Sequence, residues 1–404
     1  MTGYPFDRDD VAYLRSPAGR AALAETTRRE LSAATRLADV AAVRADHGGR
    51  AAALIETVLL RRRAAAKLAE LPGSAEWLFT DEALQQASAA AVARHRAERL
   101  AGRVVHDVTC SIGTELAALQ ATAAGLLGSD LDPVRLAMAD HNLAGALPLC
   151  RADALRPVSA APVIVADPAR RSGGRRRFDP RDYRPALDGL LQTYRDRDLV
   201  VKVAPGIDFA ALGRLGFRGE ITVTSLFGSV REACLWSPGV ATVGVRRRAV
   251  LLDRGEELTD ADPDDCPVGA AGRYLIDPDG AVVRAGLVRH YGARHHLWKL
   301  DPAIAYLTGD TVPAGTRGFE VLDQLPYKDK ALRAALTARD CGAVEILVRG
   351  VDVDPDALRR RLRSGLRGST PLSVILTRIG AGAAAKATAF VCRATRGPGG
   401  RPVG

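Results

Sequence analysis

Apolar positions recur at helical spacing through the first hundred residues of the chain. Residues 8–100 are rich in alanine, leucine and arginine and contain few helix breakers. The segment ALIETVLLRRRAAAKLAEL (53–71) predicts an amphipathic helix. A second helix is predicted over about 80–100, because the tripeptide TDE at its start supplies a capping side chain and acidic charge. We therefore predict a helical domain over residues 1–98.

From residue 103 onward, short β-like runs replace this pattern and alternate with helical segments. The alternation predicts an α/β fold with a parallel sheet and right-handed crossovers, which we assign to residues 99–250. The last two runs are joined by only FGSVRE (227–232), which is too short for a helical crossover, so this pair should be antiparallel. The predicted strands are VVHDV (104–108), LLGSDL (126–131), a short run near 148–151, APVIVADP (161–168), LVVKVAP (199–205), EITVTSL (220–226) and ACLWSP (233–238).

The last third of the chain shows two further patterns. Residues 251–318 are rich in Pro, Asp and Gly and are predicted to form a connector packed on the core. Residues 319–397 are predicted to form a small α+β domain. Its elements follow the order helix (328–339), strand (343–348), helix (355–364), strand (372–379) and strand (387–393).

The composition excludes several classes of protein. Hydrophobic residues make up 47% of the 404 residues, which is ample for buried cores. No apolar run reaches the roughly 18 residues of a membrane span, and the N-terminus lacks the build of a signal peptide. We therefore expect a cytoplasmic protein without a membrane partner. We also expect no metal site, because the six cysteines lie far apart and the histidines at 290, 295 and 296 lack paired carboxylates or thiolates.

The net charge of +10 is informative because of where it lies. Only six of the 57 basic residues are lysine, and alanine is abundant, so the total could reflect a coding bias. From Lys328 to the C-terminus, however, 15 Lys and Arg face 6 Asp and Glu, a net charge of +9. A segment this basic is typical of a surface that binds a polyanion.

Acidic residues follow three successive predicted strands, where a nucleotide site is expected. Asp107 ends the first strand, and Gly113 allows a tight turn before the next helix. One glycine alone is a weak signal. Asp130, with Asp132 as second choice, follows the second strand and could hold both ribose hydroxyls of an adenosine, and Asp153 could contact the adenine amino group. A dinucleotide site remains an alternative, but it favours a fuller GxGxxG motif.

The segment VIVADPARRSGGRRRFDP (163–180) is the predicted reacting centre. Asp167 and Pro168 would project a carboxylate and a rigid backbone into the cleft. An aromatic residue after the proline would stack a flipped adenine for methylation of its N6 amine, but Ala169 and Arg170 stand there. This weakens an adenine-N6 assignment, and a ring nitrogen or another amine is left open as the acceptor. Methylation of pyrimidine carbon 5 would need a cysteine here, and there is none. The five arginines among eight residues could clamp phosphate or be a solvated loop; they are Arg170, Arg171, Arg175, Arg176 and Arg177.

Several linked motifs resemble bacterial class I S-adenosylmethionine-dependent methyltransferases with a C-terminal THUMP-like domain. They are WLFTDEALQQAS (77–88), DVTCSIGTEL (107–116), DPARRSGGRRRF (167–178), VKVAPGIDF (201–209), SLFGSVREACLW (225–236), YLIDPDGAVVRAGLV (274–288), FEVLDQLPYKDKALRAAL (319–336) and VEILVRGVDVDPDALRRRL (344–362). The resemblance implies a Rossmann-like seven-stranded core, an N-terminal helical domain, a small α+β THUMP-like domain and S-adenosylmethionine as methyl donor. Because true THUMP domains occur in tRNA-modifying enzymes, it also implies RNA as a partner.

The resemblance assigns roles to residues that match its motifs. Cofactor contacts are expected from Asp107, Thr109, Cys110, Ser111, Gly113, Asp130, Leu131, Asp132, Asp153 and Ala154, with Thr80 and Gln86 closing over the cofactor. Asp167 and Pro168 are expected to face the target. RNA contacts are expected from the five arginines at 170–177 and from Arg349, Arg360 and Arg363.

The sequence therefore predicts an RNA methyltransferase that acts on a base nitrogen of tRNA or rRNA. Two alternatives remain at this point. One is a methyltransferase for a small molecule or a protein, and the other is a non-catalytic relative that binds RNA.

Overall fold

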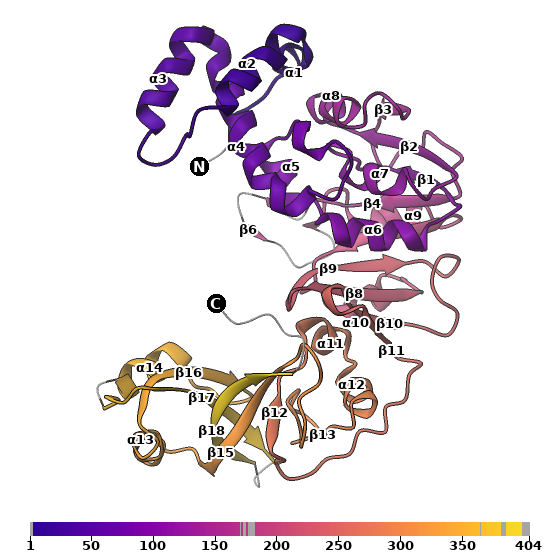
Figure 1. Cartoon of the computed structure of the whole chain (residues 1–404). Coiled ribbons are helices and arrows are strands. Elements are labelled where there is room, and N and C mark those ends of the chain that lie inside the picture. The colour runs from indigo at the N-terminus through magenta and orange to yellow at the C-terminus, as the bar shows by residue number, and fades with distance from the viewer. Residues whose placement is uncertain are drawn as a thin grey trace. The chain divides into compact units, whose positions relative to one another are not determined.

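The computed structural model describes residues 3–169, 171–172, 175–176, 182–363, 365–380 and 385–397. The chain divides into two compact units (Figure 1). The first unit contains residues 1–222 and 231–243, and the second contains residues 223–230 and 244–404. In the part of the chain that the structure describes, no helix is both long and apolar enough to cross a membrane.

The first unit begins with six helices. The predicted helix over 53–71 is confirmed as α4 (Ala51–Leu68), the longest of them. The single helix predicted over 80–100 is wrong, because the chain forms two helices there with an extended step between them. Ser88 in this step is buried and its hydroxyl donates to Glu232, so a tertiary hydrogen bond replaces helix continuity. The other helices are α1 (Arg8–Arg15), α2 (Pro17–Thr27), α3 (Arg36–His47), α5 (Asp81–Gln86) and α6 (Ala90–Arg99).

A nine-stranded sheet follows, in the order β11-β10-β8-β9-β7-β4-β1-β2-β3. β1, β2, β3, β4 and β7 run parallel to one another, and β9 is antiparallel to β7. β8 lies next to β9, so the seven predicted strands form one sheet. The strands are β1 (Val104–Asp107), β2 (Gly125–Asp130), β3 (Leu149–Arg151), β4 (Val163–Ala166), β7 (Asp198–Val203), β8 (Glu220–Leu226), β9 (Ser229–Trp236), β10 (Arg247–Leu251) and β11 (Glu256–Thr259). β10 and β11 extend the sheet beyond the seven predicted strands.

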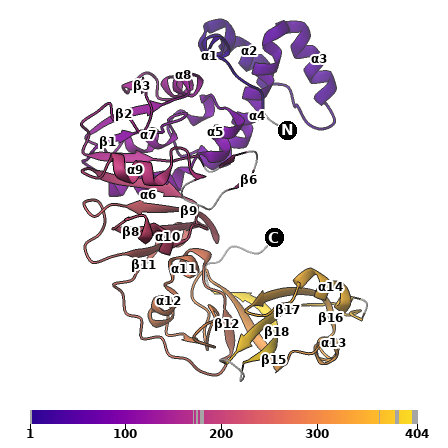
Figure 2. The same ribbon diagram turned by 180° about the vertical axis from the view of Figure 1, so that it is seen from behind.

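Helices cover both faces of this sheet, as expected for right-handed crossovers. α6 lies in front of the strands in Figure 1, and α9 lies in front of them when the molecule is seen from behind in Figure 2. The connecting helices are α7 (Thr114–Leu119), α8 (Pro133–Asn142), α9 (Leu187–Thr193) and α10 (Phe209–Arg214).

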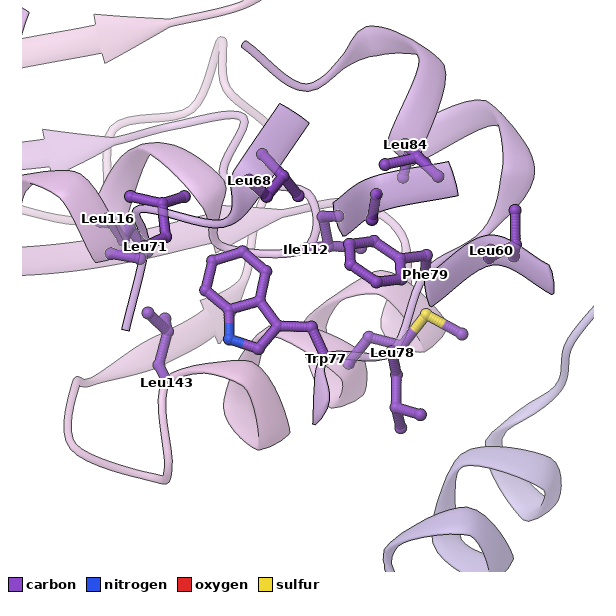
Figure 3. Close-up of a cluster of buried hydrophobic side chains, with 14 of the residues drawn as sticks. Leu60, Leu68, Leu71, Trp77, Leu78, Phe79, Leu84, Ile112, Leu116 and Leu143 are labelled. Carbon is purple, nitrogen blue, oxygen red and sulfur yellow. The ribbon is translucent and has the colours of Figure 1, made fainter. Parts of the chain in front are cut away.

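The N-terminal helices and the sheet share one hydrophobic core (Figure 3). Trp77, only 2% exposed, lies among leucines of the helical part and of the core, including Leu68 and Leu116. Phe79 lies beside Ile112 in the same cluster. Burial of large side chains is worth about 1.5–3 kcal/mol each, so this cluster fixes α5 against the loop that follows β1.

The second unit contains a seven-stranded sheet in the order β13-β14-β12-β15-β18-β17-β16. Leucines of two helices, α13 (Asp329–Thr337) and α14 (Pro355–Arg363), pack on this sheet. All five elements predicted over 328–393 are confirmed in type. The strands are β12 (Tyr274–Ile276), β13 (Trp298–Lys299), β14 (Leu307–Gly309), β15 (Arg317–Pro326), β16 (Cys341–Arg349), β17 (Thr370–Ile379) and β18 (Lys386–Arg396), and the remaining helices are α11 (Gly280–Ala285) and α12 (Val288–Arg294).

β15 is a strand that the hydrophobic pattern did not predict. Its pairing with β18 shifts register between Val321 and Asp323. A bulge of this kind interrupts the alternation of buried and exposed side chains by which a strand is recognised. The residues predicted as a connector, 251–318, contribute β12, β13 and β14 to the same sheet. The predicted domain boundaries stay predictions.

Candidate functional site

A cavity of about 300 Å³ lies at the carboxyl ends of β1, β2, β3, β4 and β7. This is the edge of an open α/β sheet where ligands bind. The cavity brings together ten of the predicted site residues, namely Gln86, Asp107, Thr109, Cys110, Ser111, Asp130, Leu131, Asp153, Ala154 and Asp167.

Four other predicted residues support the cavity from outside its lining. The Thr80 hydroxyl accepts a hydrogen bond from the Ala83 amide and caps α5, as the sequence predicted. Asp132 caps α8 in the same way, through the amides of residues 134 and 135. Gly113 is the N-cap of α7 and has a φ of 85°, a left-handed conformation that suits glycine. Pro168 follows Asp167 directly.

The loop after β1 holds a buried acid. Asp107 is 3% exposed, and its Oδ1 accepts a hydrogen bond from the Thr109 amide at 3.1 Å. Burial and, secondarily, the carboxylate of Glu115 raise the pKa of Asp107 to about 8. This side chain can therefore carry a proton at neutral pH until a cation is placed beside it.

Asp130 is held by the backbone of two different loops. Its Oδ2 accepts from the Ser111 amide and its Oδ1 accepts from the Asp132 amide, each at 2.9 Å. Ser111 itself has a φ of 49°, a strained conformation for a residue with a side chain. In this conformation the loop after β1 bonds to the end of β2, and the Asp130 carboxylate lies on the cavity wall.

The loop after β3 is fixed by a buried tyrosine. Asp153 accepts from the Leu155 amide at 2.9 Å, and the Tyr194 hydroxyl donates to the Ala154 carbonyl at 2.7 Å. Leu131 and Leu155 also line the cavity, although they are 59% and 37% exposed. Two exposed apolar side chains beside two carboxylates form a wall that suits a flat, polar-edged ring.

The end of the cavity at Asp167, the predicted reacting centre, contains an ion pair that the sequence interpretation missed. The Lys202 ammonium donates a hydrogen bond to Oδ2 of Asp167, and the Asp167 amide donates to the Thr109 hydroxyl at 2.6 Å. Burial lowers the pKa of Lys202, but the carboxylates of Asp167, Glu232 and Glu115 more than offset this, so the pKa lies above its usual value. A lysine within the apolar run LVVKVAP was a signal for such a site.

A second buried network supports this end of the cavity, and the sequence interpretation missed it as well. Arg96 of α6 is 2% exposed, and its guanidinium donates two hydrogen bonds of 2.6 Å to Glu115 and a further one to Glu232. Ser88 joins the network by bonding to both Arg96 and Glu232. Because Ser88 and Glu115 line the cavity, the network ties its polar wall to α6 and β9.

The residues that flank the arginine-rich segment in the sequence pair with each other in the cavity wall that contains Asp167. Ala169 and Arg184 exchange two backbone hydrogen bonds of 2.8 and 3.0 Å, and both line the cavity. Between them, β5 (Arg171–Ser172) pairs with β6 (Arg175–Arg176), so the backbones of three predicted phosphate-binding residues lie in this pair of strands. Arg170 and Arg177 lie outside the described residues.

The other predicted RNA contacts lie in the second unit. Arg360 and Arg363 are exposed on α14. Arg349 lies in β16, where its guanidinium pairs with Asp277 at 2.7 Å and stacks on the Tyr306 ring at 4.7 Å. This residue therefore has an intramolecular structural role. Within the ranges that the structure describes, no group of three His, Cys, Asp or Glu side chains could hold a metal ion.

Comparison with known proteins gives two kinds of match. Residues 316–394 match the family model of a THUMP domain-like unit, and residues 7–64 match a domain of unknown function, DUF8688. A crystal structure of a Porphyromonas gingivalis W83 protein, assigned provisionally as a methyltransferase, superposes with a TM-score of 0.70 at 19% identity. The match covers 96% of this chain and 99% of the other, and it shows a shared fold.

Two Mycobacterium tuberculosis proteins, from strains CDC 1551 and H37Rv, are named S-adenosylmethionine-dependent methyltransferases. Each is 65% identical to this chain over 360 residues, which is 88% of this chain and 100% of the relative. With the shared fold and the THUMP-like match, these relatives confirm the predicted class I methyltransferase core and its C-terminal domain. The chain therefore belongs to the S-adenosylmethionine-dependent methyltransferases and is an enzyme that uses S-adenosylmethionine as its methyl donor.

Proposed function

We propose that this enzyme methylates a base nitrogen in RNA, with tRNA or rRNA as its substrate. The observation that carries the proposal is the position of Asp167. This carboxylate lies at the end of β4 in the cavity, which is also lined by Ala169 and Arg184, the two residues that flank the arginine-rich segment in the sequence. A site for a nitrogen nucleophile and a segment suited to phosphate therefore adjoin.

The cavity suits the methyl donor. Asp130 would hold the ribose hydroxyls, Asp153 would accept from the adenine amino group, and Leu131 and Leu155 would flank the ring. Asp107 would face the cationic amino-acid part. S-adenosylmethionine supplies a methyl carbon that is already activated by its bond to a positively charged sulfur. The protein therefore needs only to orient the acceptor and take up its proton.

Asp167 would perform both tasks at the reacting end. Its amide is held by the Thr109 hydroxyl and its Oδ2 by Lys202, so that Oδ1 can accept a hydrogen bond from the acceptor nitrogen. Pro168 would keep the backbone of Asp167, the residue before it, from helical geometry and so keep the carboxylate in the cavity.

Basic side chains of the second unit support RNA as the substrate. Six lysines and arginines are exposed on or next to α13 and α14, and they are Lys328, Lys330, Arg333, Arg360, Arg361 and Arg363. The THUMP-like match covers both helices. Because THUMP domains occur in tRNA-modifying enzymes, this match supports RNA by analogy.

The Asp167→Ala variant tests the proposal. With tritium-labelled methyl donor and RNA from cells that lack this protein, we expect the variant to lose at least 100-fold in methyl transfer. Calorimetry should show its affinity for S-adenosylmethionine within about threefold of wild type. Asp196→Ala is the matched control, because that side chain is 87% exposed. Normal turnover by Asp167→Ala would contradict the assignment.

RNA binding by the wild-type protein is a separate test of the substrate. Binding through phosphate contacts must weaken steeply as salt is added. Binding that ignores salt, or no binding, would favour a small molecule or a protein as the acceptor.

A further inference from the structure

Lys202 is a buried cation whose ammonium has more protons than hydrogen-bond partners among the described residues. An ammonium group carries three protons, and the hydrogen bond to Asp167 uses one of them. Among the described residues, no second hydrogen-bond acceptor for this ammonium is recorded. The side chain is 6% exposed and lines the cavity. Because a buried donor without an acceptor costs about 1–3 kcal/mol, the geometry points to a ligand oxygen in this place.

Asp167 offers the complementary group next to that donor. Lys202 occupies one of its oxygens, and the carboxylate is 24% exposed where it lines the same cavity. A ligand at this end of the cavity therefore meets a positively charged donor and a negatively charged acceptor side by side. A lactam, in which an N–H adjoins a carbonyl, presents the matching pair of groups.

We propose that Lys202 and Asp167 together bind the acceptor base as a lactam, through N1–H and the carbonyl of guanine or through N3–H and a carbonyl of uracil. This inference rests on the proposed function. Lys202 donates to the carbonyl oxygen and Asp167 accepts from the neighbouring N–H. Both groups are catalytic in the sense that they touch the reacting base.

The step balances in charge and in electrons. The lactam N–H proton passes to Asp167 as the nitrogen forms its bond to the methyl carbon. The carbon–sulfur bond breaks, and its electron pair goes to sulfur, which becomes neutral. Lys202 stabilises the negative charge that the carbonyl oxygen gains while the N–H proton leaves, which is the role of an oxyanion-stabilising donor.

The same charge argument disfavours the other two bases. Attack by a neutral adenine or cytosine nitrogen leaves positive charge on the acceptor, and a fixed ammonium beside that acceptor would repel it. Asp167, Glu232 and Glu115 keep Lys202 charged, whereas Arg96 opposes them. Lys67 of α4 is a further nearby cation, and its own pKa is lowered to about 8 by burial and by Lys202.

The position of the methyl group in RNA tests the proposal. RNA from cells that lack this protein is treated with wild-type enzyme and S-adenosylmethionine, digested to nucleosides and analysed by mass spectrometry. Methyl on N1 of guanosine or N3 of uridine is the expected result. Methyl on adenosine, on cytidine or on an exocyclic nitrogen would overturn the lactam inference and leave the proposed function standing. Absence of methyl transfer to any RNA would overturn the proposed function, and this inference with it.

Variants at Lys202 give a second readout. Lys202→Met should lose about 100-fold or more in kcat at neutral pH, and raising the pH should recover part of this loss because solvent then removes the lactam proton. Lys202→Arg keeps the charge and should retain far more activity. Arg195→Met, whose side chain is 68% exposed, is the control. Calorimetric affinity for S-adenosylmethionine and thermal unfolding report whether each variant is folded. A folded Lys202→Met with the same fractional loss at every pH would overturn the role of Lys202.

Discussion

The two ends of the cavity are built in different ways. The end proposed for the cofactor consists of carboxylates held by backbone amides from nearby loops, as in the hydrogen bonds of Asp107, Asp130 and Asp153. The reacting end consists of buried charges from elements that lie far apart in the sequence, since Arg96 pairs with a residue 136 positions away. Local turns can bind a common cofactor, whereas an acceptor site requires charges that the fold brings together.

Among these variants, the largest effect on stability is expected from a substitution of Arg96. Arg96→Met leaves Glu115 and Glu232 buried without their shared cation, so we expect the free energy of unfolding to fall by about 3–5 kcal/mol. Chemical denaturation measures this change. Arg94→Met, two residues away on α6, is the control, because the Arg94–Glu70 pair is about half exposed and should cost less than about 1 kcal/mol. Equal losses in the two variants would show that the Arg96 network contributes no more to the free energy of unfolding than the exposed Arg94–Glu70 pair.

A smaller effect is expected at the cofactor end. Asp130→Asn keeps the size of the side chain but removes the charge and one of the two acceptor oxygens that now bind backbone amides. We expect affinity for S-adenosylmethionine to fall about 10- to 100-fold, which corresponds to about 1.4–2.8 kcal/mol. Isothermal calorimetry measures this affinity, and Asp196→Asn is the matched surface control. Unchanged affinity would remove Asp130 from the cofactor site.

The pH dependence of stability tests how the Asp107 carboxyl differs from the other carboxylates of the cavity. Asp107 has a pKa of about 8 in the folded protein against an ordinary 3.8, so between these values the folded state binds more protons than the unfolded state. Its contribution to stability is therefore lost as the pH rises through this window, by at most about 1.4 kcal/mol per pH unit. Buried His106, with its pKa lowered to about 4, acts in the opposite direction.

The difference between wild type and Asp107→Asn isolates this carboxyl from His106. We expect the wild type to lose stability relative to the variant on going from pH 5 to pH 8, as measured by urea unfolding at each pH. Parallel curves for the two proteins would mean that Asp107 is ionised throughout. The same experiment in saturating S-adenosylmethionine should reduce the difference, because a cation beside Asp107 favours its charged form.

Much of the fold, and the gathering of the predicted cofactor residues in one cavity, could be predicted from the sequence, because the decisive signals are local. Each acid follows an apolar run directly, so the positions of Asp107, Asp130 and Asp167 at strand ends follow from the period-2 pattern and the turns. The helix break at Ser88 could not be predicted, because alanine-rich sequence favours a continuous helix and only the distant Glu232 explains the interruption.

The ion pair at Asp167 could not be predicted for the same reason, because its two residues are distant in the sequence. Lys202 is visible as a charge within an apolar strand, but its partner Asp167 lies 35 positions earlier in the sequence. Arg349 shows what net charge alone leaves out. An arginine in a basic segment suggests an RNA contact, yet its guanidinium is engaged by Asp277 and Tyr306. Net charge indicates which part of a chain can bind a polyanion, but intramolecular ion pairs decide which of its basic side chains are available for that contact.

The place of β9 in the sheet affects the order in which the protein can form during synthesis. β9 is made after β8, yet it lies between β7 and β8 in the sheet. A nascent chain that has emerged only as far as β8 therefore lacks the strand through which β8 joins the sheet. β9 also supplies Glu232, the partner of Arg96 and Ser88. The polar wall of the cavity can thus be completed only after residue 236 has left the ribosome, although most of its residues were made more than 100 positions earlier.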